Sequence, residues 1–348
     1  MKFNPKAYEQ ILFDMDGVIT SEAIYWDAAA LTVYELLFDY RFYGRQEIDR
    51  AWCRQHVKEL SAIILDHGKT IRAVKKLGVN TNWDLAYLVF AASKYIDPEP
   101  VYFEPGHFEA VRMFIENMTA LAPELYDLVG GLLAVGQKGH GEEFWRRGGD
   151  GLWKQLHGCF QRWLHGDDSL EGLNAMEQPL LPLAELRKTL SALQEAGPVL
   201  GIGTGRNREE ILYPLQMWKI EGYFSPTHIA TYDEVLAAEQ ALGSRRTLAK
   251  PDPFVFLKAA FGAQYTDQQL AEGAYDKEAC KRILVVGDAP SDLLSAQRAG
   301  FAFAAVLTGI EGKDARLYFE EQKADYIFDS VKEMVEPYGD TTADTPDA

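Results

Sequence analysis

Four short apolar runs, each followed by an aspartate or a threonine, constrain the fold of this chain more than any other feature. They are Ile11–Phe13, Val199–Gly203, Ile283–Gly287 and Phe303–Leu307. Each is about the length of a buried strand, and near-continuous apolar runs are typical of parallel strands covered on both faces. Helical patterns lie between them at residues 183–196, 207–218 and 254–261. This alternation predicts an α/β fold with a doubly wound parallel sheet.

Residues 21–178 have a different pattern, with few strand-like runs and many apolar residues at helical spacing. Helices are predicted at residues 21–40, 45–66, 82–96 and 108–118. Six of the seven tryptophans lie in this region, and we expect them to fill its core. They are Trp26, Trp52, Trp83, Trp145, Trp153 and Trp163.

The sequence therefore predicts a large all-helical domain inserted into an α/β domain. We place the α/β core domain at residues 1–20 and 179–338, and the helical domain at 21–178. The last ten residues, 339–348, are polar and acidic without an apolar anchor, so we expect a disordered tail.

Composition excludes several classes of protein. The net charge of −17 argues against a nucleic-acid surface and against attraction to an anionic membrane. Cys53, Cys159 and Cys280 form no CxxC pair, so a zinc ribbon or a thioredoxin-type motif is excluded. There is no apolar signal core near residue 1 and no run of about 20 apolar residues. We expect a soluble, cytoplasmic protein, and the oligomeric state is left open.

Chemically active residues gather where the predicted strands end and helices start. They are Asp14, Asp16, Thr204, Lys250, Asp288 and Asp292. Carboxylates brought together repel one another and need a cation, and an all-oxygen set of ligands suits Mg²⁺. Lys250, Thr204 and the N–H groups after Thr204 can hold an anion instead. Mg²⁺ beside an anion is the arrangement needed for phosphoryl transfer.

Asp14 and Asp16 are two residues apart, so a turn after the first strand can present both side chains to one cleft. One carboxylate can attack phosphorus as a nucleophile. The other can protonate the leaving oxygen and then deprotonate the water that breaks the aspartyl phosphate. A single carboxylate could not serve both roles in one turnover.

Four segments, DMDGVIT, GIGTGR, AKPDP and VVGDAPSD, occur in the order of motifs one to four of the haloacid dehalogenase (HAD) superfamily, which the chain resembles. The helical insertion looks like a C1-type cap, and the pattern is similar to the phosphoglycolate phosphatase and β-phosphoglucomutase branch. The resemblance covers about half of the chain. An aspartate at position 16 favours phosphate-ester chemistry within this superfamily.

The resemblance implies a role for each matching residue. Asp14 would be the nucleophile and Asp16 the general acid and base. Thr204 and the Gly205 N–H would bind the phosphoryl group, and Lys250 would neutralise the nucleophile and the phosphoryl oxygens. Mg²⁺ would be held by Asp14, the backbone carbonyl of Asp16, Asp288 and, directly or through a water, Asp292. The implied activity is Mg²⁺-dependent hydrolysis of a small phosphorylated metabolite.

Two further segments are candidates for choosing the substrate. Arg206 lies beside the predicted phosphoryl site and is expected to bind substrate. In the helical insertion, Trp145, Arg146 and Arg147 offer a platform for a second anionic group, or else form a solvated turn.

Several alternatives stay open. A phosphotransferase or phosphomutase of the β-phosphoglucomutase kind would use the same residues. A non-catalytic binding protein would be expected to lose Asp14 or Asp16, and both are present. The insertion could also be a docking module. A dinucleotide fingerprint fails because Arg206 and Arg208 occupy the positions that need glycine, and no P-loop is present.

Overall fold

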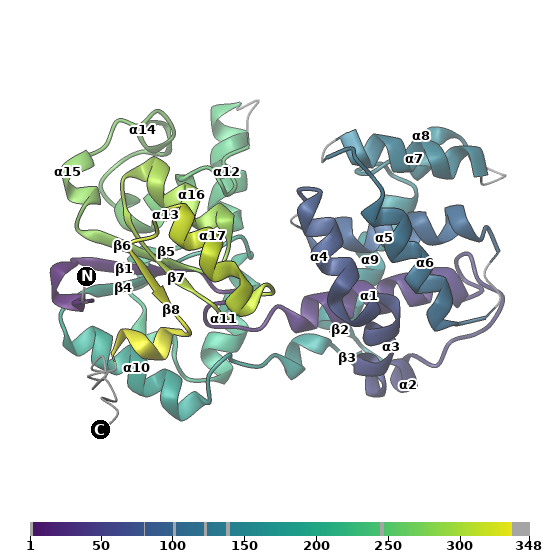
Figure 1. Ribbon diagram of the computed structural model, residues 1–348, viewed down its shortest axis with the longest axis horizontal. Coiled ribbons are helices and arrows are strands. Elements are labelled where there is room, and N and C mark those ends of the chain that lie inside the picture. The colour runs from purple at the N-terminus through teal and green to yellow at the C-terminus, as the bar shows by residue number, and fades with distance from the viewer. Residues whose placement is uncertain are drawn as a thin grey trace, which may run out of the picture. The chain divides into compact units, whose positions relative to one another are not determined.

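A computed structural model describes residues 3–79, 81–99, 102–121, 124–136, 140–243 and 247–335 (Figure 1). The predicted tail at 339–348 lies outside the described residues. The chain divides into two compact units, one of Met1–Ser21 with Gln178–Ala348 and one of Glu22–Glu177. Among the described residues, no helix has the length and apolar character needed to span a membrane.

The first unit is built on a parallel sheet with strand order β5-β4-β1-β6-β7-β8. The strands are β1 (Gln10–Phe13), β4 (Val199–Gly203), β5 (Ile229–Ala230), β6 (Ile283–Gly287), β7 (Ala302–Val306) and β8 (Tyr326–Phe328). Because the chain runs from β1 outward to β4 and β5 and then returns to β6, the strand order reverses direction beside β1. The doubly wound α/β fold is thus confirmed.

Successive side chains of a strand point to opposite faces of the sheet, which explains why the apolar runs are nearly continuous. Ile11 and Phe13 pack on one face of the sheet, and Leu12 packs on the other. Helices α10 (Leu183–Glu195) and α11 (Arg208–Met217) supply side chains to the first face. The second face is covered by α12 (Tyr232–Leu242), α13 (Phe254–Phe261), α16 (Pro290–Ala299) and α17 (Arg316–Glu321), with α14 (Asp267–Ala271) beside them. Both faces are therefore buried, as parallel strands require.

Side chains accept hydrogen bonds from backbone N–H groups at the starts of two helices. Asn207 caps α11 and accepts a hydrogen bond from the Glu210 N–H at 2.9 Å. The Asp252 side chain accepts from the N–H of Phe254, the first residue of α13, at 3.0 Å. A short helix, α15 (Lys277–Cys280), then leads into β6.

The second unit is helical in its described residues except for a small hairpin of β2 (Gly166–Asp167) and β3 (Leu170–Glu171). Its helices are α1 (Ala23–Phe38), α2 (Arg50–Gln55), α3 (Val57–Ile64), α4 (Lys69–Lys76), α5 (Asn82–Ile96), α6 (Pro105–Glu116), α7 (Glu124–Gly136), α8 (Glu142–Trp145) and α9 (Leu152–His165). Almost every residue of α1 is buried, because α3, α5 and α9 pack around it. A helix that is apolar on all sides belongs at the centre of its domain.

Two predictions for this unit were wrong in detail. The helix predicted over residues 45–66 is divided into α2 and α3 at His56, whose backbone departs from helical angles. Trp145 and Trp163 fill the core as predicted, but Trp52 is 45% exposed and stacks on the His56 ring at 4.3 Å. Trp52 therefore packs on His56 at the surface, where α2 ends, and does not fill the core.

Arg147 links the loop after α8 to helix α5. Its guanidinium pairs with Asp84, whose carboxylate is buried and also accepts hydrogen bonds from Thr81 at 2.8 Å and Tyr126 at 3.1 Å. The same guanidinium lies over the rings of Tyr126 and Trp153. The contacts of Arg147 are thus those of a residue that anchors a loop.

Replacing Arg147 by Met is expected to destabilise the helical unit by about 2 kcal/mol, because it leaves the buried Asp84 carboxylate without its cation. Urea unfolding followed by tryptophan fluorescence measures this change, since six of the seven tryptophans lie in this unit.

Arg146→Met is the matched control, because the Arg146–Glu143 ion pair is exposed and should contribute less than about 0.5 kcal/mol. Equal destabilisation by the two substitutions would contradict the anchoring role.

Candidate active site

Three neighbouring strands bring the predicted site residues together. Asp14 follows β1, Thr204 follows β4 and Asp288 follows β6, and these strands are adjacent and parallel. Asp292 lies in the first turn of α16. The carboxyl ends of parallel strands meet at one edge, and the point where strand order reverses is where such sheets bind ligands.

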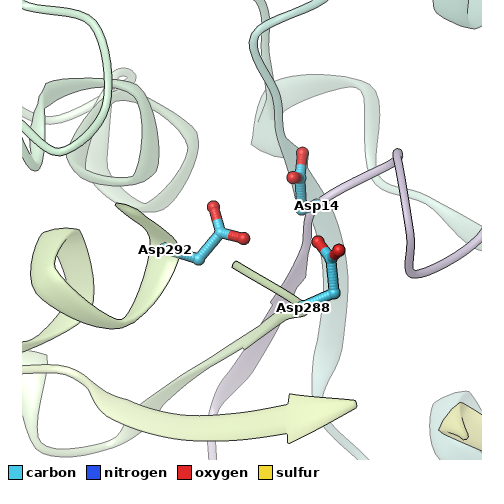
Figure 2. A group of neighbouring side chains, drawn as sticks. All are labelled: Asp14, Asp288 and Asp292. Atoms are coloured by element: carbon cyan, nitrogen blue, oxygen red, sulfur yellow. The ribbon is translucent and has the colours of Figure 1, made fainter. Parts of the chain in front are cut away.

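The three carboxylates of Asp14, Asp288 and Asp292 form a tight cluster. One oxygen from each lies within 4.8 Å of the others. Figure 2 shows Asp14 and Asp288 at the ends of their strands, with Asp292 reaching toward them from its helix. Among the described residues, these three carboxylates are close enough together to hold a metal ion.

Lys250 lies among these carboxylates. Its ammonium is 2.9 Å from Asp14 Oδ1 and 2.8 Å from Asp292 Oδ1. The three atoms are buried, so these ion pairs are shielded from solvent. Burial disfavours a charged lysine, but the two carboxylates together hold the pKa of Lys250 above its ordinary value.

The Asp14 carboxyl lies in surroundings that disfavour its ionised form. Burial, opposed by Lys250 and reinforced by Asp292 and Asp16, raises the pKa of the Asp14 carboxyl to about 7. One ammonium among three carboxylates leaves an excess of negative charge. A divalent cation would remove that excess, so the cluster fits Mg²⁺ in ligand type and in charge.

Two glycines allow Asp288 to reach the cluster. A Cβ on Gly309 would lie 1.9 Å from Asp288 Oδ2, and one on Gly17 would lie 2.2 Å from the same atom. Gly17 also has a φ of +70°, which disfavours any side chain. The Thr308 hydroxyl donates to the Gly17 carbonyl and joins the two loops. Gly309 was not predicted from the sequence, although it directly follows the threonine after the fourth apolar run.

Asp16 is held by Arg206 rather than by the carboxylate cluster. Arg206 Nε lies 3.1 Å and 3.0 Å from the two Asp16 oxygens, and a terminal nitrogen of the same guanidinium also donates to Asp16. That nitrogen donates to the Thr20 hydroxyl at 2.8 Å. Arg206, which was expected to bind substrate, therefore has its guanidinium engaged within the protein.

Thr204 is buried at the end of β4, and its hydroxyl accepts a hydrogen bond from the Arg206 N–H at 3.3 Å. A Cβ on Gly205 would meet nothing within 4 Å, so packing does not require glycine there. Phosphoryl binding by Thr204 and by the Gly205 N–H stays a prediction.

Comparison with known proteins supports the resemblance seen in the sequence. Residues 247–334 match the family model for HAD-hydrolase-like proteins, a segment that includes Lys250, Asp288 and Asp292. No curated protein matches the chain in sequence.

Several solved structures align with most of the chain. An X-ray structure from the Northeast Structural Genomics Consortium has a TM-score of 0.75 and 27% identity, covering 94% of this chain and 97% of that chain. A HAD family hydrolase from Deinococcus radiodurans, solved with phosphate and sodium, has a TM-score of 0.44, 15% identity and 94% coverage of both chains. A predicted phosphoglycolate phosphatase from Haemophilus somnus has a TM-score of 0.43 and 15% identity, covering 94% and 96%.

Gly309→Ala is expected to weaken Mg²⁺ binding by about 10- to 100-fold, because the new methyl group would displace the Asp288 carboxylate. Calorimetric titration with Mg²⁺ measures the change. Gly222→Ala is the control, since a Cβ there meets nothing within 4 Å. Wild-type Mg²⁺ affinity in Gly309→Ala would remove Asp288 from the metal site.

Mg²⁺ binding is expected to tighten as pH rises toward about 7, by up to about tenfold per pH unit, because Asp14 must lose its proton. Titration with Mg²⁺ in two buffers of different ionisation enthalpy would detect the released proton. Binding without proton release at pH 6 would contradict the raised pKa of Asp14.

The raised pKa of Asp14 also affects the stability of the metal-free protein. The folded protein binds this proton more tightly than the unfolded chain does, so the free energy of unfolding should fall as pH rises from 3.8 to about 7.

Proposed function

We propose that this HAD-like hydrolase is a Mg²⁺-dependent phosphatase that hydrolyses a small phosphorylated metabolite through an aspartyl phosphate on Asp14. The observation that carries the proposal is the cluster of Asp14, Asp288 and Asp292 at the edge of the sheet, in which the Lys250 ammonium pairs with Asp14 and Asp292. Such a site can receive a metal ion and an anion together, as phosphoryl transfer requires.

Each residue has a separate task in the proposed reaction. Asp14 attacks phosphorus and forms the acyl phosphate, while the leaving oxygen takes a proton from Asp16. Asp16 then takes a proton from the water that attacks the acyl phosphate, which releases phosphate and restores Asp14. Lys250 offsets charge on the phosphoryl oxygens, and Thr204 with the Gly205 N–H binds them.

Asp14, the Asp16 carbonyl, Asp288 and Asp292 would hold Mg²⁺. When bound, Mg²⁺ would supply the positive charge that allows a carboxylate nucleophile to approach a phosphate dianion. The close approach of the three carboxylates and the glycines packed against Asp288 support this assignment.

We further propose that the helical unit, Glu22–Glu177, acts as a cap that selects the leaving group. Caps of this kind exclude water from a reactive intermediate. The anchoring contacts of Arg147 favour a structural task for that residue, so other side chains of the unit would choose the substrate.

Phosphate release from a panel of sugar phosphates, phosphoglycolate, nucleotides and an aryl phosphate tests the proposal. Release should require Mg²⁺ and stop with EDTA. Asp14→Asn should lower turnover at least about 10³-fold, since the nucleophile is lost.

Asp267→Asn is the matched control, because Asp267 pairs with Lys258 in the same domain and takes no part in the cluster. Release that persists in Asp14→Asn would refute the proposal. Release that appears only after a sugar phosphate acceptor is added would favour the phosphotransferase alternative.

A further inference from the structure

The pairing of Arg206 with Asp16 has a consequence that rests on the proposed phosphatase function. The Arg206 side chain is only 3% exposed, whereas 24% of the Asp16 side chain is exposed. Arg206 thus contacts the Asp16 carboxylate from the protein interior and leaves its outer side accessible. A residue in this position can act on the reaction through Asp16 more directly than through the substrate.

The guanidinium fixes both oxygens of Asp16. Its Nε and a terminal nitrogen contact the carboxylate side-on, a forked geometry that determines orientation as well as charge. Thr20, which is fully buried, receives a hydrogen bond from the same guanidinium and donates to Asp16 Oδ1 at 3.3 Å. The Asp16 side chain is therefore restrained by two partners.

The backbone around both residues is also braced. The Met15 carbonyl accepts hydrogen bonds from Ile19 at 2.8 Å and Thr20 at 2.9 Å, which closes the turn that carries Asp16. Arg206 is held at its own backbone, where its N–H donates to the Thr204 hydroxyl and its carbonyl accepts from Tyr232 at 2.8 Å. Arg206 therefore connects the predicted phosphoryl-binding threonine to the predicted proton-transfer carboxylate.

We propose that Arg206 is a positioning residue that orients Asp16 for proton transfer to the leaving group, and that it does not bind the substrate. Proton transfer depends on placing the carboxyl oxygen within hydrogen-bond reach of the departing oxygen. Without the guanidinium, the Thr20 hydroxyl would be the side-chain partner left to Asp16 among the described residues, and Asp16 would sample other rotamers. The nucleophile Asp14, which pairs with Lys250, keeps its own contacts.

Two aryl phosphates separate proton transfer from the rest of the reaction. The phenolate leaving group of phenyl phosphate is basic and needs a proton, whereas p-nitrophenolate departs without one. Because kcat/KM includes only steps up to formation of the aspartyl phosphate, water attack does not affect it. Arg206→Met should lower kcat/KM for phenyl phosphate about 10²-fold and affect p-nitrophenyl phosphate much less.

A double-mutant cycle with Asp16→Asn then tests whether Arg206 acts through Asp16. In the Asp16→Asn protein, adding Arg206→Met should change kcat/KM for phenyl phosphate by no more than about twofold. Arg206→Lys keeps the positive charge without the forked guanidinium, so it should recover part of the loss in kcat/KM. If the Met variant does not fold, the Lys variant tests the positioning role in its place. Arg208→Met is the matched control, because Arg208 pairs with Glu234 at 2.6 Å.

Equal losses for the two substrates, or additive losses in the cycle, would overturn the positioning role and indicate substrate binding or general support of the fold. Absence of Asp14-dependent hydrolysis of both substrates by the wild-type protein would instead refute the proposed function, and the inference with it.

Discussion

The contact of one buried ammonium with two carboxylates, in a cluster of three, is the interaction on which the site depends. Asp14, Asp288 and Asp292 would repel one another if Lys250 were absent, and even with Lys250 the pKa of Asp14 is raised. The sheet makes this crowding possible, because β1 and β6 are adjacent and end at the same level. Gly17 and Gly309 complete the arrangement by leaving room for the Asp288 carboxylate.

The two aspartates of the first motif have different surroundings. Asp14 is buried beside Lys250, whereas Asp16 is more exposed and bound to Arg206. The two carboxylates are only two residues apart in sequence. Because each has its own cationic partner, they do not compete for one counterion. The different partners agree with the different tasks proposed for the two residues, since one would attack phosphorus and the other would exchange a proton with the leaving oxygen.

Sequence alone predicted the elements whose signals are local and strong. Strands β1, β4, β6 and β7 and helices such as α5 have continuous apolar patterns or clear caps, and their positions were predicted within a few residues. Strands β5 and β8 were missed because two or three residues carry too little pattern, and pairing with a neighbouring strand stabilises them.

The partners of individual side chains were beyond prediction from sequence. Arg206 meets Asp16 across 190 positions, and Arg147 meets Asp84 across 63, so only the fold decides which carboxylate each arginine contacts. The requirement for glycine at position 309 likewise arises from the approach of Asp288, which no local pattern reveals.

The most direct test of this account is mass spectrometry of the protein quenched in acid during turnover of p-nitrophenyl phosphate with Mg²⁺. The account predicts a phosphoryl group on Asp14 in the peptide that contains both aspartates, and none in Asp14→Asn. Phosphate release with the phosphoryl group on another residue would contradict the account. Phosphate release without any phosphorylated protein, even when Asp16→Asn slows water attack, would also contradict it.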